Sequence, residues 1–148
     1  MATESYELPS FLVERISREK YRRWLQRKAS THAKRDRKRS PTPIILSIYK
    51  RKIHDAVCAS EGVDWYTGEK LEWEKISTYS NEDSKANRSK YKAGLVLLPT
   101  VDHVAGENEA YDFVICGWRT NDAKNDLNPQ EFLNLCRMVI ARHGSSTL

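Results

Sequence analysis

Two short apolar runs separated by a polar turn, and followed by a stretch at helical spacing, most constrain what this chain can fold into. The first run spans residues 95–98 and leads through Pro99 toward a polar pair; the second spans 111–116. The turn between them is Ala105-Gly106-Glu107-Asn108, which predicts a hairpin. Thr120 is a suitable N-cap for a helix after the second run. This part of the chain is therefore predicted to be a strand–turn–strand–helix unit.

Polar side chains that suit a metal site lie at fixed places on this unit. Asp102 and His103 are consecutive at the predicted strand end, so their side chains diverge and can have different roles. Asn121 and Asn125 are four residues apart, which places them on one helix face, with Asn121 in the first turn where a phosphate is favoured. Carboxylate and amide oxygens suit Mg²⁺ or Mn²⁺ better than Zn²⁺. The pattern indicates metal-assisted phosphodiester hydrolysis, with His103 as general base.

These residues resemble the motif of the HNH, or ββα-metal, endonucleases. Asp102-His103 matches the family's Asp-His pair, and Asn121 matches its last position, inside an Asn-Asp-Ala-Lys run that is similar to the family's N-x-x-K. The resemblance implies that Asp102 and Asn121 ligate the metal and that His103 activates water. Asn125 falls where nuclease toxins of the family carry a further ligand. The middle position, usually Asn, is most simply Asp112 here, and the resemblance implies that it orients the base.

Two cations flank the last motif position. Lys124 belongs to the N-x-x-K run and is a candidate for holding the scissile phosphate, as is Arg119; the alternative for both is surface charge. A looser likeness covers residues 66–71, which are similar to the turn before the HNH core in some RNA-guided nucleases. The resemblance implies products with 5′-phosphate and 3′-hydroxyl ends. One such site cuts one strand.

Basic residues are concentrated near the N-terminus. Residues 10–40 carry a net charge of +9, whereas residues 41–148 carry −2. Such segregation is expected of a protein that meets a polyanion, although a solvated helix end is the alternative. The predicted nucleic-acid contacts are cations in two basic groups: Lys34, Arg35, Arg37, Lys38, Arg39, Lys85 and Arg88.

Composition and cysteine spacing bear on the compartment. No window of 18 apolar residues and no signal-peptide pattern is present, so neither a membrane span nor a secretory signal is predicted. The three cysteines form no C-x-x-C pair, and Asp64-Trp65-Tyr66-Thr67 stands where many HNH relatives carry a zinc knuckle. We therefore expect no structural zinc and a cytoplasmic protein.

The rest of the chain is predicted to be mainly helical. The last helix has clear signals: Asn128 as N-cap, Pro129 next, Glu131 completing a capping box, and an apolar face typical of scaffold. His54 is predicted to be structural, and His32 to be exposed. Helices are expected over residues 10–39, 44–59, 82–92 and 129–143.

The sequence thus predicts an α+β fold, in which a ββα-metal (HNH) hairpin-helix core is flanked by helices. Residues 1–43 are predicted to form a basic N-terminal helical extension, and 44–148 a nuclease domain with its core at about 94–127. The predicted function is a divalent-metal-dependent endonuclease that nicks DNA, as a monomer or a homodimer and without a membrane partner. The alternatives are a catalytically inactive HNH fold that only binds nucleic acid, an RNA-associated basic protein, and a nuclease that also acts on RNA.

Overall fold

The computed structural model describes residues 6–40, 42–76, 93–104 and 112–144. The polar helix expected at 82–92, with Lys85 and Arg88, lies outside them. The α+β class is confirmed, with a two-stranded antiparallel sheet and helices around it. The elements are η1 (Ser10–Leu12), α1 (Arg18–Arg37), α2 (Leu46–Ser60), η2 (Trp73–Lys75), β1 (Pro99–His103), β2 (Phe113–Gly117), α5 (Trp118–Lys124) and α6 (Pro129–His143).

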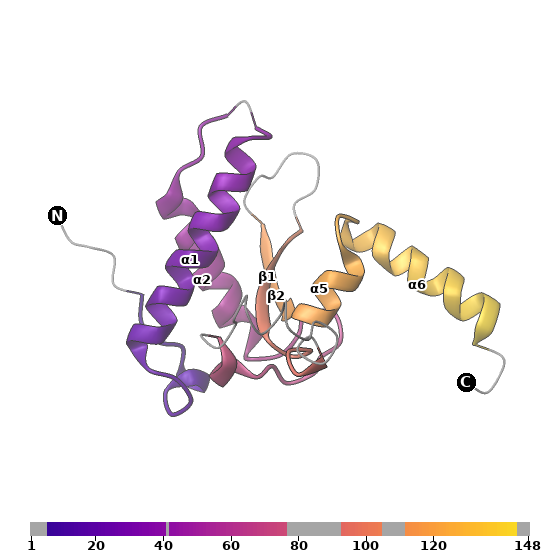
Figure 1. Ribbon diagram of the computed structural model, residues 1–148, viewed down its shortest axis with the longest axis horizontal. Helices are drawn as coiled ribbons and strands as arrows, with labels where there is room; N and C mark the ends of the chain where they lie inside the picture. The colour runs from indigo at the N-terminus through magenta and orange to yellow at the C-terminus, as the bar shows by residue number, and fades with distance from the viewer. Residues whose placement is uncertain (1–5, 41, 77–92, 105–111, 145–148) are drawn as a thin grey trace.

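The hairpin lies between two helical layers (Figure 1). β1 and β2 pair antiparallel, from Pro99 opposite Gly117 to His103 opposite Phe113. α2 packs against β2 and α1 packs against α2, while α5 lies on the other side of the hairpin. Pro99 is the first residue of its strand, where a missing N–H is tolerated. The predicted strand end at Asp102-His103 is confirmed.

The apolar run 95–98 precedes the strand as a turn and is not part of it. Its carbonyl groups bind other segments: Leu98 O accepts from Trp118 N–H at 2.9 Å, and Val96 O accepts from Arg119 N–H at 3.2 Å. These bonds satisfy part of the backbone of the run at the first turn of α5, outside the strand pair.

The predicted single helix over residues 10–39 is wrong. Residues 10–12 form a separate 3-10 turn, and α1 begins at Arg18 because the Ser17 hydroxyl accepts a hydrogen bond from Lys20 N–H at 3.1 Å. The buried face of α1 runs from Tyr21 to Ala33. His32 is only 7% exposed, so its predicted exposure is wrong; its ring packs against Phe113 with centroids 5.4 Å apart.

The hydrophobic core contains residues from both predicted parts of the chain, the extension at 1–43 and the domain at 44–148. Trp24 of α1 packs edge-on against Trp73, with ring centroids 5.4 Å apart. From α2, Tyr49, Ile53 and Val57 are buried. His54, which is predicted to be structural, is partly buried, and its Nδ1 is 2.6 Å from the Tyr21 hydroxyl oxygen. α1 is therefore packed into the core of the molecule.

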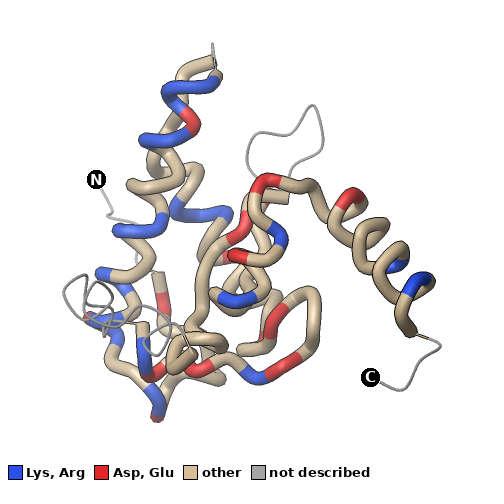
Figure 2. Tube along the Cα trace, turned by 45° about the vertical axis from the view of Figure 1, so that its right-hand side comes forward, with Lys and Arg blue, Asp and Glu red and all other residues tan. Residues whose placement is uncertain are grey.

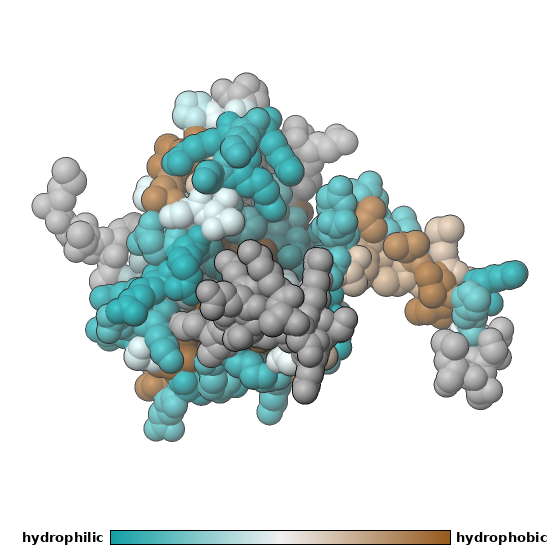
Figure 3. Space-filling model, viewed as in Figure 1, coloured by the Kyte–Doolittle hydropathy of each residue, from teal (hydrophilic) through white to brown (hydrophobic). Residues whose placement is uncertain are grey.

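α6 has the caps that the sequence predicts, but it is not packed as scaffold. The Asn128 side chain accepts from Glu131 N–H at 2.9 Å, and the Glu131 carboxylate accepts from Asn128 N–H at 3.0 Å. The helix projects from the body, and Figure 3 shows apolar surface along it. None of its described residues is buried; Met138 is 69% and Ile140 65% exposed. Among the described helices, none is long and apolar enough to cross a membrane.

Candidate active site

The carboxylate of Asp64 joins the turn at residues 64–69 to the start of α5. Asp64 is 1% exposed, and its Oδ2 accepts hydrogen bonds from Gly117 N–H and the Thr120 hydroxyl, both at 2.8 Å. Its Oδ1 accepts from the N–H groups of Tyr66 at 2.8 Å and Thr67 at 3.1 Å. This one side chain links the two segments.

These bonds explain why α5 begins earlier than predicted. The helix begins at Trp118 with Gly117 at the N-cap, and the Thr120 hydroxyl donates to Asp64, so the predicted Thr120 cap is wrong. Gly117 is needed here because a Cβ would lie 2.9 Å from Val96 O. Asn121 consequently lies fourth in the helix and not in its first three positions, and Asn125 is the C-cap residue with φ +53°.

Asp102 is held by donors from two other segments. Its carboxylate is 5% exposed; Oδ2 accepts from the Tyr66 hydroxyl at 2.5 Å and Oδ1 from Lys124 Nζ at 3.1 Å. Lys124 is 2% exposed, so this ion pair is buried. Burial and the hydrogen bond to Asp102 raise the pKa of Tyr66, which keeps its hydroxyl protonated as a donor. The carboxylate orientation is therefore fixed by its neighbours.

His103 follows Asp102 at the end of β1 and is partly exposed. Its ring lies 5.6 Å from the ring of Phe113, the residue opposite it in the hairpin. The rings of His32 and Tyr49 also lie against Phe113, each at 5.4 Å between centroids. One phenyl ring thus supports the candidate base and contacts α1 and α2.

Seven of the twelve predicted site residues that the structure describes line one cleft of about 930 Å³. β1 contributes Asp102 and His103, and α5 contributes Asn121 and Lys124, with Asn125 directly after it. α1 forms the other wall, and Figure 2 shows Lys and Arg residues repeated along this helix. The α1 residues that line the cleft are Trp24, Arg27, Lys28, Thr31, His32 and Arg35, followed by Arg39.

The wall formed by α1 is cationic, and its buried histidine is neutral. Burial first, and then the charges of Arg35 and Lys28, lower the pKa of His32 to about 4. Its Nδ1 lies 3.1 Å from Arg35 Nη2, and because a guanidinium only donates, the imidazole accepts this hydrogen bond. Arg35 is thereby held at the cleft by a side chain that is itself buried.

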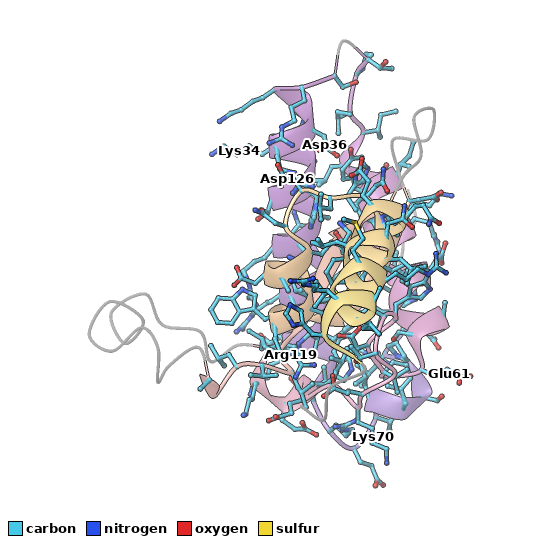
Figure 4. The ribbon with its side chains drawn as sticks, turned by 90° about the vertical axis from the view of Figure 1, so that its right-hand side faces the viewer. Lys34, Asp36, Glu61, Lys70, Arg119 and Asp126 are labelled. Carbon is cyan, nitrogen blue, oxygen red and sulfur yellow. The ribbon has the colours of Figure 1, made fainter. Side chains whose placement is uncertain are left out.

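Several predicted site residues lie elsewhere. Arg119 does not line the cleft; it forms an ion pair with Glu69. In Figure 4, Arg119 lies toward one end of the molecule, whereas Lys34 lies near the other end with Asp36 and Asp126. Two further cations predicted to bind nucleic acid, Arg37 and Lys38, are exposed but do not line the cleft.

Asp112, the predicted orienter, is partly exposed and does not line the cleft that holds the candidate base. Its backbone carbonyl accepts from Val104 N–H at 3.0 Å, one residue beyond each strand of the hairpin. Within the described part of the chain, no hydrogen bond of its side chain is formed. The orienting role of this carboxylate stays a prediction.

The hairpin side of the cleft carries oxygen donors of the kind that hard divalent cations take. A carboxylate has about four lone-pair sites, and Tyr66 and Lys124 use two of those of Asp102. Asn121 and Asn125 add amide oxygens on the same wall. Among the described residues, no three His, Cys, Asp or Glu side chains converge. In proteins, Mg²⁺ usually keeps several water ligands and takes one or two carboxylates.

Sequence reasoning missed two residues that shape this site. Lys28 lines the cleft and reaches Thr100 of β1, and its spacing of seven residues from Arg35 on one helix is a signal that the sequence contains. Tyr66 lies in the turn that carried the looser family likeness, yet nothing local in the sequence places that turn beside Asp102.

Comparison of the chain with protein-family models, with curated proteins and with solved structures finds no match. The likeness to the HNH endonucleases therefore depends on the motif residues alone.

Proposed function

We propose that this protein is a divalent-metal-dependent endonuclease that hydrolyses DNA phosphodiester bonds, cutting one strand per site. The observation that carries the proposal is the cleft that Asp102, His103 and Asn121 share with the cations of α1. A hydrolytic centre for nucleic acid needs a proton acceptor, metal-binding oxygens and positive charge for the phosphate backbone in one place. Residues from distant parts of the sequence meet these three needs together.

His103 is the general base of the proposed reaction. As a partly exposed imidazole in the cleft, it accepts a proton from a water molecule that attacks the scissile phosphate. The ring of Phe113 supports the imidazole and limits the directions in which it can face. The proton accepted by His103 is later returned to solvent.

Asp102 and Asn121 would hold the metal, with Asn125 as a further amide. When bound, Mg²⁺ or Mn²⁺ supplies Lewis-acid polarisation of the phosphate and stabilises the leaving 3′ oxygen. Tyr66 and Lys124 act as positioning residues through Asp102, because they fix the direction of its carboxylate. Arg35 of α1, and Arg39 just after this helix, bind phosphate groups of the substrate strand.

The second candidate function is an HNH fold that binds nucleic acid without cutting it. The observation that favours it is the pairing of Asp102, whose two oxygens already accept from Tyr66 and Lys124. In this case the Lys124 ammonium neutralises the carboxylate permanently and takes the place of a metal. The cleft and its cationic wall would serve binding alone.

Plasmid nicking separates the two functions. Purified protein is incubated with supercoiled plasmid and Mn²⁺, Mg²⁺ or chelator, beside His103→Ala and a matched variant, His143→Ala, on the exposed end of α6. We expect open circular product with either metal, none with chelator or His103→Ala, and wild-type rates with His143→Ala. Cutting by His103→Ala at the wild-type rate would overturn the assigned base. Binding without cutting by the wild type would establish the second function, and a labelled RNA substrate tests whether RNA is also cut.

A further inference from the structure

Lys28 is a cation of the cleft wall that the proposed reaction does not use. It lies in the middle of α1 and is partly buried, and its Nζ donates a hydrogen bond to Thr100 Oγ1 at 3.1 Å. Thr100 belongs to β1, two residues before Asp102, and is itself 8% exposed. The ammonium thus lies where the α1 wall meets the hairpin wall.

The environment of this ammonium is short of negative charge. Its hydrogen-bond partner among the described residues is a neutral hydroxyl, and no carboxylate there forms an ion pair with it. Burial first, and then the nearby charge of Arg27, lower the pKa of Lys28. An ammonium withdrawn from water is usually compensated by an anion or a hydrogen-bonded partner of opposite charge. One hydroxyl satisfies one of its three N–H donors.

Other cations continue this charge along the same face of α1. Arg35 follows seven residues later, about 10 Å further along the helix axis at about 1.5 Å per residue. His32 lies between them and accepts from Arg35, so the guanidinium is held at the cleft. Lys28 and Arg35 therefore present two positive groups along a line that a polyanionic strand can follow.

We propose that Lys28 binds a phosphate group of the nucleic-acid backbone in the cleft, and that Arg35 binds a further phosphate along the same strand. The identification of the polyanion as a nucleic acid rests on the proposed function. The chemistry is that of a charge-assisted hydrogen bond from an ammonium, which can keep Thr100 as one acceptor and offer its free N–H groups to the phosphate.

A purely structural role for Lys28 makes a different prediction. If the lysine only fastens α1 to β1 through Thr100, loss of the Thr100 hydroxyl has the same effect as loss of the ammonium. If the lysine binds phosphate, loss of the hydroxyl leaves the charge at the cleft. Thr100→Val is therefore the variant that separates the two roles, because it removes the acceptor and keeps the side-chain shape.

The test is binding of a short fluorescent DNA duplex, measured by anisotropy in chelator so that no cutting occurs. We compare the wild type with Lys28→Met and Lys28→Gln, with Thr100→Val, and with Lys20→Met, a matched variant at an exposed position of α1. Circular dichroism checks that each variant is folded. Two neutral replacements of different polarity are used so that the result does not depend on one of them folding.

We expect both Lys28 variants to bind about tenfold more weakly, as loss of a charged hydrogen bond predicts. The slope of log affinity against log salt falls by about 0.9, the value for one phosphate contact. Thr100→Val and Lys20→Met stay within about twofold of the wild type. Lys28 variants that bind like the wild type would overturn the inference, as would Thr100→Val weakening binding equally, or a wild type that does not bind.

The binding result and the nicking result are independent. A wild type that binds through Lys28 but cuts no plasmid leaves the phosphate site established and the proposed reaction wrong. A wild type that cuts, with Lys28 variants that bind unchanged, leaves the reaction standing and the phosphate site wrong.

Discussion

Replacing Asp64 with alanine removes the carboxylate that connects the turn at residues 64–69 with the start of α5. The side chain accepts hydrogen bonds from four donors, and two of these bonds, from Gly117 N–H and the Thr120 hydroxyl, are fully buried. The other two donors, the N–H groups of Tyr66 and Thr67, are partly buried and can bind water after the substitution. The cost therefore comes mainly from the two buried donors.

The size of the loss follows from these two donors. A buried donor left without a partner costs about 1–3 kcal/mol. With about 2 kcal/mol for each of the two, Asp64→Ala lowers the free energy of unfolding by about 4 kcal/mol. This is a large share of the roughly 5–15 kcal/mol that stabilises a typical domain. Asp64→Asn keeps one carbonyl oxygen but turns an NH₂ group toward donors, so we expect about half of this loss.

The measurement is urea unfolding at neutral pH, followed by far-ultraviolet circular dichroism. Asp122→Ala is the matched control, because Asp122 is an exposed carboxylate on the same short helix. We expect this control to unfold within about 0.5 kcal/mol of the wild type. An Asp64→Ala protein as stable as the control would refute the conclusion that this carboxylate holds the junction.

Three further predictions concern other parts of the molecule. Tyr66→Phe removes the donor to Asp102 Oδ2; initial nicking rates at limiting Mn²⁺ should fall about tenfold, and unchanged rates would show that the hydroxyl does not position the carboxylate. The pKa of His32 is about 4 in the folded protein, below its unfolded value of about 6.5. The stability that the neutral imidazole contributes is therefore fully present above pH 6.5, and the free energy of unfolding falls by about 3 kcal/mol as the pH is lowered to 4. Urea unfolding of wild type and His32→Asn at both ends of this range checks the sign, and equal pH dependence of the two proteins would contradict it. Ile140→Ser on exposed α6 should change the unfolding free energy by less than about 0.5 kcal/mol, whereas Ile115→Ala in the core costs about 3 kcal/mol; a comparable loss for both would mean that α6 is packed.

Local patterns in the sequence predicted the helices and strands that are determined by residues close together in the chain. The capping box at Asn128 is confirmed, and so is the helix expected over residues 44–59, which is α2. The strand end at Asp102-His103 is confirmed as well. Each depends on neighbours along the chain, such as a cap three residues away or a repeat at helical spacing.

Contacts between distant segments decided what the sequence did not predict. Thr120 has the chemistry of an N-cap, but its hydroxyl donates to Asp64, 56 residues earlier in the chain. His32 follows an apolar stripe that weakens in the sequence, yet Phe113 of β2 covers it. The apolar face of α6 predicts packing, yet none of its described residues is buried; Phe132, whose ring lies 5.8 Å from that of Tyr66, stays partly exposed.

The same distinction between local and long-range contacts applies to the candidate site. The spacing of the motif predicted that Asp102, His103 and Asn121 lie together, and they line one cleft. This could be predicted because a hairpin and the helix that follows it are a local unit. Lys28 and Tyr66 were missed because they reach that cleft across 72 and 36 residues of sequence. The chemical roles given to all five side chains stay predictions until the plasmid and binding assays are done.

The ring of Phe113 lies against His32 and Tyr49 in the core and also against His103. The candidate base is thus supported by a side chain that belongs to the core. Loosening of the layer that α1 and α2 form would weaken the contacts that hold Phe113, and with them the support of this imidazole. If His103 is the base of the proposed nuclease, the half-life of nicking activity on warming measures how well this layer stays packed. Variants selected only for a higher melting temperature through α1 and α2 should also remain active for longer.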